Sequence, residues 1–223
     1  MIDRVQDKRL KDVFRITLLA IRLQRVKRVL FAPHEDRAEG DAEHSYQLAL
    51  LAWFLVKKMR LRYSLERVIC YSLVHDLPEV HAGDTDVYHN GRLGDKHERE
   101  ARACELLKSE FPDFPEMHKL ILEYESGQTE EACFVKALDK LVAAVGIAID
   151  DGRSWHVRQT TFWKMVETQR PKVACHQGVL KMYDKLLAFL EKNKSHFFPR
   201  STNNTFPFAN GDHLPFVVRP RER

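Results

Sequence analysis

An adjacent histidine and aspartate, His75 and Asp76, close an apolar segment that runs from Val68 to Val74. A carboxylate is costly to bury unless it is paired with a cation or bound to a metal ion. An imidazole and a carboxylate side by side are good ligands for a divalent metal ion. A capped helix end with a hydrogen-bonded histidine explains an isolated pair more simply, so a metal site requires further ligands elsewhere in the chain.

Two further ligand-type residues lie on apolar stripes with helical spacing. His44 shares a stripe with the apolar residues from Leu48 to Leu55, and Asp139 sits between Val135 and Val142. Each alone is more simply a hydrogen-bonded core residue. Together with His75 and Asp76, however, they would bury two carboxylates, and one divalent cation would satisfy all four side chains at once. The expected cofactor is therefore one divalent ion, with Co, Mn, Zn, Ni, Fe and Mg all open.

Helical periodicity dominates the chain, and the predicted fold class is all-α without strands. Ser64 and Asp41 are candidate N-caps. We expect polar loops over 32–42 and 81–94, and helices over 3–31, from Asp41, over 64–80, 95–110 and 116–126, from Thr129, and over 157–192. Proline, asparagine and serine leave no regular period near the C-terminus, so the predicted organisation is a helical domain over 1–195 and an irregular tail over 196–223.

Composition restricts the class of protein. With 223 residues, 44% hydrophobic and 30% charged, the chain suits one soluble globular domain. Its net charge of +4 is interleaved rather than clustered, which argues against a nucleic-acid partner. The four cysteines form no CxxC motif, and the chain shows no signal peptide and no apolar run of the roughly 20 residues that a membrane span needs. We therefore expect a cytoplasmic protein without a membrane partner.

The order and spacing of these residues resemble the HD-domain metal-dependent phosphohydrolases, over roughly residues 15–190. Three local motifs carry the resemblance. They are Ala42-Glu43-His44-Ser45, then His75-Asp76-Leu77-Pro78-Glu79 followed by Gly83-Asp84, and Lys136-Ala137-Leu138-Asp139-Lys140-Leu141. The second motif is similar to the H-D-x-x-E-x-x-x-G-D run of the bacterial 5′-deoxynucleotidase branch. The resemblance implies an HD-domain helical bundle with His44, His75, Asp76 and Asp139 as metal ligands.

The resemblance also implies roles for other side chains. Glu79 corresponds to the catalytic carboxylate that acts as general acid or base. Asp84 corresponds to an acidic residue that binds the sugar and orients the attacking water. Arg28 corresponds to a phosphate-binding arginine of the N-terminal helix, with Arg25 as a competitor, and Lys140 could also neutralise phosphate charge. A homodimer is implied as well. In that branch the arginine is commonly followed by tryptophan, and here Val29 follows, which leaves sugar and base preference open.

The predicted reaction is hydrolysis of (deoxy)nucleoside 5′-monophosphates to nucleoside and phosphate. An HD-type triphosphohydrolase is the alternative, since several basic residues could hold three phosphates, namely Arg25, Lys96, His97, Arg99 and Arg102. A two-metal cyclic-nucleotide phosphodiesterase is less favoured, because no adjacent histidine pair lies between Asp76 and Asp139. A non-catalytic helical interaction protein with a basic N-terminal helix is the remaining alternative.

Overall fold

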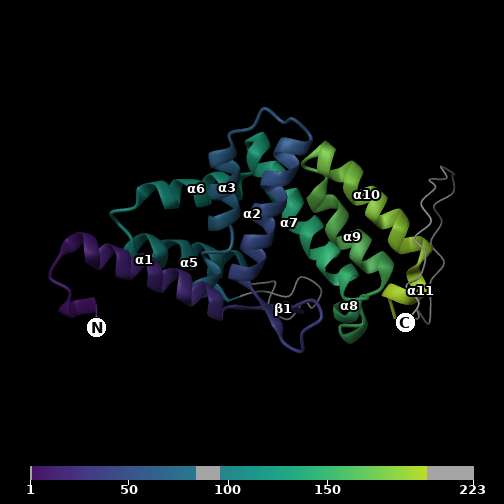
Figure 1. Ribbon diagram of the computed structural model, residues 1–223, viewed down its shortest axis with the longest axis horizontal. Helices are drawn as coiled ribbons and strands as arrows, with labels where there is room; N and C mark the ends of the chain where they lie inside the picture. Colours follow the sequence, from purple (N-terminus) through teal and green to yellow (C-terminus); the bar gives the residue numbers. More distant parts are fainter. Residues whose placement is uncertain (1, 84–95, 200–223) are drawn as a thin grey trace.

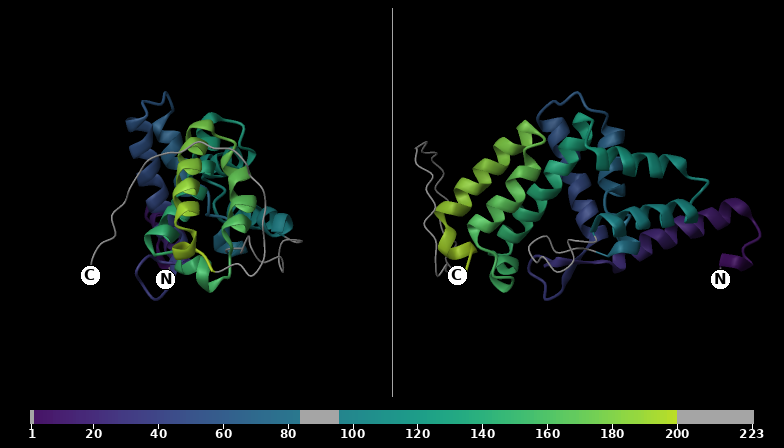
Figure 2. Two further views of the ribbon diagram at one scale, coloured as in Figure 1. Left: turned by 90° about the vertical axis from the view of Figure 1, so that its right-hand side faces the viewer. Right: turned by 180° about the vertical axis from the view of Figure 1, so that it is seen from behind.

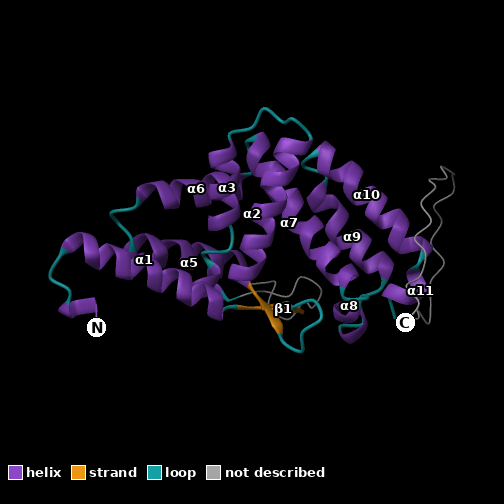
Figure 3. Ribbon diagram, in the orientation of Figure 1, coloured by secondary structure: helices purple, strands orange, loops and turns teal. Residues whose placement is uncertain are grey.

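The computed structural model describes residues 2–83 and 96–199, and these residues form mostly α-helices (Figures 1 and 3). The expected all-α fold class is confirmed. The elements, in chain order, are a 3-10 helix η1 (Ile2–Arg4), α1 (Lys8–Arg25), β1 (Lys27–Phe31), β2 (Ala38–Gly40), α2 (Asp41–Lys58), α3 (Leu65–Val74), α4 (Glu79–Ala82), α5 (Lys96–Glu110), α6 (Pro115–Ser126), α7 (Glu130–Ile149), α8 (Arg153–Val157), α9 (Phe162–Val173), α10 (Gln177–Lys192) and α11 (Lys194–Phe197).

The expectation that the chain has no strands is wrong at one place. β1 and β2 pair antiparallel, with Lys27 opposite Gly40 and Phe31 opposite Ala38. The segment therefore leaves the helix at Val26, whose backbone is extended, rather than continuing helical to residue 31. The run Val29-Leu30-Phe31 fits a strand, but five residues are too few for a helical and an extended period to be told apart.

The helix α7 forms the centre of the molecule (Figure 1). It packs against α2, α3, α6, α9 and α10. Its inward side chains include Phe134, Val135 and Leu138, each with no exposed surface. Fully burying such side chains stabilises the fold by about 1.5–3 kcal/mol apiece. Asp139 is thus carried on the best-packed helix, where its backbone position is fixed.

Helix ends set the positions of the other ligand candidates. Ser64 caps α3 as expected, since its hydroxyl accepts a hydrogen bond from the Arg67 amide at 3.3 Å. The predicted helix 64–80 is interrupted, because α3 ends at Val74 and α4 begins only at Glu79. At the start of α2 the N-cap is Gly40 rather than Asp41, and the Glu43 carboxylate accepts from the Gly40 amide at 2.8 Å.

The C-terminal helices α9 and α10 pack against α7 and against each other. The predicted region 157–192 forms α9 and α10, and α8 precedes them unpredicted. Phe198 stacks on Trp155 with ring centroids 4.5 Å apart, so the packed chain extends a few residues past position 195. The division at residue 195 stays a prediction, because the predicted tail from residue 200 onward lies outside the described residues. No helix within 2–83 and 96–199 combines the length and apolar character that crossing a lipid bilayer requires.

Candidate metal centre

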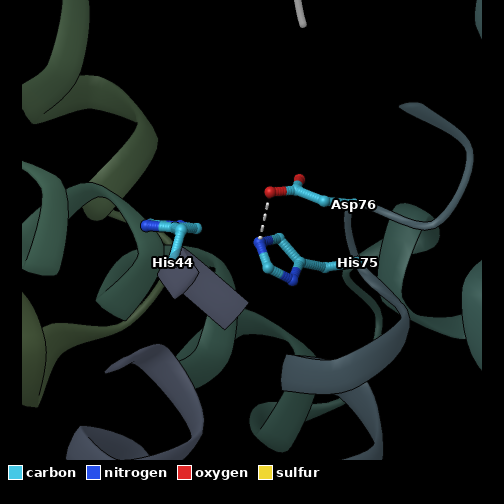
Figure 4. Close-up of side chains that lie close together, drawn as sticks. All are labelled: His44, His75 and Asp76. Atoms are coloured by element: carbon cyan, nitrogen blue, oxygen red, sulfur yellow. Dashed lines mark ion pairs between the residues drawn. The ribbon is translucent and has the colours of Figure 1, made fainter. Parts of the chain in front are cut away.

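Three ligand-type side chains converge inside the helical bundle (Figure 4). His44 comes from the first turn of α2, and His75 and Asp76 follow the last residue of α3. One ligand atom from each lies within 4.8 Å of the other two. Both histidines are buried, and their ring centroids are 5.5 Å apart. The structure thus brings together residues separated by about thirty positions, as the sequence predicted.

The orientation of His75 suits a metal ligand. Its Nδ1 lies 3.0 Å from the carbonyl oxygen of Ser72 and can act only as a donor there. This hydrogen bond fixes the tautomer and leaves the Nε2 lone pair directed away from the helix. Nε2 lies 3.0 Å from Oδ2 of Asp76 (Figure 4). Two acceptor atoms this close require a cation or a proton between them.

Asp139, on α7, lies beside this group. Its Oδ1 lies 2.9 Å from Nε2 of His44, and its Oδ2 lies 2.6 Å from Nζ of Lys140. Among the described residues, Asp139 is not part of the group within 4.8 Å and is joined to it through His44. Lys140 does not extend freely into solvent; it restrains the carboxylate beside it.

The distances among His44, His75 and Asp76 fit one divalent ion. Two ligands about 2.1 Å from an ion and at right angles to each other lie about 3 Å apart. The two contacts, His75 to Asp76 and His44 to Asp139, are 3.0 and 2.9 Å. Two imidazole nitrogens and two carboxylates suit a first-row transition metal or magnesium better than calcium. The donor types of all four side chains, and the spacing of His44, His75 and Asp76, are therefore consistent with the expected cofactor, and Asp139 is joined to the group through His44.

The pKa values of the four ligand candidates also favour metal binding. Burial and the nearby Arg28 lower the pKa of His44 to about 4, which keeps the imidazole neutral at pH 7, as metal binding requires. Burial alone would lower the pKa of His75, but the Asp76 carboxylate outweighs it and raises the pKa above the ordinary value. Burial likewise opposes ionisation of Asp76 and Asp139, yet neighbouring cations hold both pKa values below normal. The site thus keeps two anionic carboxylates, and a metal ion would replace the proton on His75.

Arg28 lies beside the centre on β1, and not on the N-terminal helix as the sequence led us to expect. Its Nη1 is 3.1 Å from Oδ2 of Asp76, and its Nε is 3.2 Å from Oε2 of Glu39 on β2. Oδ1 of Asp41 is a further 3.8 Å contact. Sequence reasoning connected neither Glu39 nor Asp41 with Arg28, and both acids are buried. The one sequence feature that could have indicated their role is that they flank Gly40 just before the motif that contains His44.

Replacing Arg28 with glutamine should destabilise the fold. Glu39, Asp41 and Asp76 would remain buried without the cation that they share, and breaking a buried ion pair by removing one partner costs about 3–5 kcal/mol. We expect the free energy of unfolding of Arg28→Gln, measured by urea titration at pH 7, to fall by about 3 kcal/mol. Arg37→Gln is the matched control, because Arg37 pairs with Glu35 and Glu43 at the surface, and its loss should destabilise the fold much less than the loss of Arg28. Equal losses in the two variants would contradict this interpretation of Arg28.

Of the two predicted catalytic residues, Glu79 and Asp84, the structure describes only Glu79. Glu79 is the first residue of α4, and its amide donates to the Asp76 carbonyl at 3.0 Å. This backbone hydrogen bond therefore holds Glu79, the candidate acid–base group, one turn after the ligand candidate Asp76. Asp84, the other predicted catalytic and sugar-binding residue, lies outside the described residues.

A tyrosine that the sequence did not single out packs on the centre. The Tyr124 ring of α6 meets the His75 ring edge-on, with centroids 5.7 Å apart. The Nζ atom of Lys136 lies over the same tyrosine at 4.6 Å. Burial, reinforced by the Asp139 and Asp76 charges, raises the Tyr124 pKa well above normal, so the hydroxyl stays neutral. Its apolar helical spacing gave no signal beyond a core position.

Comparison with known proteins places this centre in a family. The family model described as HD domain matches residues 20–180. The 5′-deoxynucleotidase HDDC2 of Mus musculus is 34% identical over 107 residues, which cover 47% of this chain and 52% of that protein. HDDC2 of Xenopus laevis is 33% identical over 133 residues, covering 58% and 65% respectively. The chain thus aligns with about half to two thirds of the length of these curated relatives.

A solved structure agrees over a longer stretch. A protein of Magnetospirillum magnetotacticum, described as a predicted metal-dependent phosphohydrolase, is 28% identical with a TM-score of 0.74. The match covers 86% of this chain and 100% of that one. Since the family model spans most of the chain, and includes every ligand candidate from His44 to Asp139, the chain belongs to the HD domain family.

Proposed function

We propose that the protein is a metal-dependent phosphohydrolase that converts (deoxy)nucleoside 5′-monophosphates to nucleoside and phosphate. The observation that carries the proposal is the convergence of His44, His75 and Asp76, whose ligand atoms lie within 4.8 Å of one another, with Asp139 2.9 Å from His44. The names of the HDDC2 relatives supply the substrate class, because those proteins are 5′-deoxynucleotidases.

The proposed chemistry assigns a task to each group. The four ligands would hold one divalent ion, which when bound supplies Lewis-acid charge and lowers the pKa of water. Glu79 would exchange a proton with the attacking water or the leaving ribose oxygen. Arg28 and Lys140 would offset phosphate charge, supported by their contacts to Asp76 and Asp139 respectively. Asp84 would contact the sugar and orient the water.

A triphosphohydrolase is the second candidate, and one contact favours it. Arg99 on α5 donates to the Ala82 carbonyl at 3.3 Å, at the end of the helix that Glu79 begins. A guanidinium at this place could contact phosphates beyond the first.

A substrate panel separates the two reactions. Purified protein charged with Mn²⁺ or Co²⁺ is incubated with dAMP and with dATP, and phosphate, triphosphate and deoxyadenosine are measured. We expect equal amounts of phosphate and deoxyadenosine from dAMP, and loss of both when the metal is removed with EDTA. Release of triphosphate from dATP without turnover of dAMP would overturn the monophosphatase in favour of the second candidate.

The remaining expectations are part of this proposal. A homodimer follows from the resemblance to the deoxynucleotidase branch. A cytoplasmic location is supported by the four cysteines, which are free thiols. A nucleotide would be the small-molecule partner, without a nucleic acid or a membrane, and the HD domain would end near residue 195.

A further inference from the structure

The short helix α4, which begins at Glu79, depends on other elements for its orientation. A single helical turn has little stability of its own, because isolated helices shorter than about 12–15 residues are marginal in water. Leu77 and Val80 pack against the hydrophobic core, which fixes where α4 lies. Apolar contacts are not directional, however. The rotation of α4 about its axis, and with it the direction of the Glu79 side chain, must therefore be set by hydrogen bonds.

His81 makes such polar contacts, on the other side of α4 from Glu79. Successive residues of an α-helix are about 100° apart, so two positions separate these side chains by about 200°. The Nε2 atom of His81 lies 3.3 Å from Oε1 of Glu110 on α5 and 3.2 Å from Nη2 of Arg22 on α1. The His81 side chain is only 15% exposed. Two helices that are distant in sequence therefore meet on one atom of α4.

Glu110 is at the centre of this cluster. Its Oε2 accepts a hydrogen bond from Nη1 of Arg22 at 2.7 Å, and its main-chain carbonyl oxygen accepts one from Arg15. His81 can accept from Arg22 when its proton is on Nδ1, or donate to Glu110 when its proton is on Nε2. Either tautomer keeps α4 attached to the pair of Arg22 and Glu110. The Glu110 carboxylate thus has a defined position from which it restrains α4.

The same side of α4 is held by α5 at its last residue as well. Nη1 of Arg99 contacts the Ala82 carbonyl oxygen at 3.3 Å, and inside α4 the Gly83 amide donates to the Glu79 carbonyl oxygen at 2.8 Å. The right view of Figure 2 shows α1 and α5 at the end of the molecule opposite α9 and α10. The four ligand candidates lie on or directly after α2, α3 and α7. Disturbing the contacts of α4 should therefore affect Glu79 and leave the metal ligands in place.

We propose that Glu110 is a positioning residue for proton transfer by Glu79. Through Arg22 and His81 it sets the rotation of α4, and so directs the Glu79 carboxylate toward the metal centre. The inference rests on the proposed function, in which Glu79 is the general acid or base. Misplacing a catalytic group by about 1 Å can lower a rate about a hundredfold, so a rotated α4 should slow the chemical step.

Glu110→Ala should lower kcat without changing KM or the metal content. With the substrate that the wild type hydrolyses, we expect kcat to fall about 10- to 100-fold, because Glu79 is misdirected rather than removed. Glu110→Gln should keep kcat within about threefold, since its amide can still accept from Arg22 and donate to His81. Asp184→Ala is the matched control, because Asp184 also joins two helices through an arginine, Arg170, and it should leave kcat unchanged.

His81→Phe removes the link to α4 alone. The phenyl ring fills the place of the imidazole without a hydrogen-bonding atom, and the pair of Arg22 and Glu110 remains. We expect kcat to fall as in Glu110→Ala. Amide hydrogen exchange gives a readout apart from activity. The Ala82 and Gly83 amides, which donate within this turn, should exchange faster in both variants, whereas α7 should exchange as in the wild type. Unchanged exchange at these amides would overturn the proposal.

A double-mutant cycle with Glu79→Gln tests whether Glu110 acts through Glu79. Adding Glu110→Ala to Glu79→Gln should change kcat by less than about twofold, because no proton transfer remains to be directed. Effects that multiply independently would overturn the proposal, as would wild-type kcat or loss of the metal in Glu110→Ala. Circular dichroism checks that each variant is folded. A wild type that hydrolyses neither dAMP nor dATP would instead overturn the proposed function, and this role of Glu110 with it.

Discussion

Asp76→Asn should abolish both metal binding and activity. The substitution keeps the size of the side chain but removes the anionic oxygen that lies 3.0 Å from Nε2 of His75 and 3.1 Å from Nη1 of Arg28. A neutral amide is a weak ligand, and its NH₂ group is a donor that would face the Arg28 guanidinium or the imidazole. We expect kcat/KM for dAMP to fall at least about a thousandfold, because both Lewis-acid charge and water activation are lost.

Elemental analysis and steady-state kinetics together measure this effect. The metal content of the Asp76→Asn protein should fall close to zero after gel filtration, in parallel with its activity. Asp184→Asn is the control, because Asp184 pairs with Arg170 at the surface, remote from the centre in sequence and in fold. An Asp76→Asn enzyme that retains both metal and turnover would show that Asp76 is a structural partner of Arg28 and not a ligand.

Glu79→Gln should separate chemistry from metal binding. Glu79 begins α4 one turn after Asp76, and it is not among the proposed ligands. Glutamine preserves shape and hydrogen bonding but cannot take up or release a proton. General acid–base groups contribute typically about 10²- to 10⁴-fold, so kcat should fall by that factor while the metal content stays at the wild-type level.

The readout for Glu79 is therefore a comparison of kcat, KM and metal content. KM should change little, because the phosphate contacts assigned to Arg28 and Lys140 remain. Glu167→Gln on α9 provides a control for loss of a carboxylate at an exposed position. If Glu79→Gln lost its metal together with its activity, Glu79 would belong to the ligand set, and its assignment as a separate acid–base group would be wrong.

The ligand candidates were predictable because helical periodicity carries information on burial. His44 and Asp139 occupy positions in the apolar repeat where hydrophobic residues belong, and both are indeed buried. A polar residue in such a position requires a hydrogen-bond partner, a counter-ion or a metal ion, because burying it alone is costly. The helices themselves followed from the same repeat and from caps such as Ser64.

The surroundings of the centre were not predictable in the same way. Arg28 contacts Glu39 only because β1 and β2 pair, and a strand of five residues leaves too weak a period to be recognised beside a helix. Contacts between distant positions, such as Tyr124 with His75, depend on tertiary packing that no local pattern encodes. The predicted helix 64–80 continued through the break between α3 and α4, where Pro78, a residue compatible with a kink, is the N-cap of α4.

The number of metal ions per chain tests the proposed metal centre most directly. Metal-free protein would be loaded with Mn²⁺ or Co²⁺, passed through gel filtration and analysed for metal and protein together. His44, His75, Asp76 and Asp139 predict one ion per chain in the wild type and none in His75→Ala. Two ions per chain would indicate a two-metal phosphodiesterase site, and no bound ion would contradict the metal centre on which the proposed function depends.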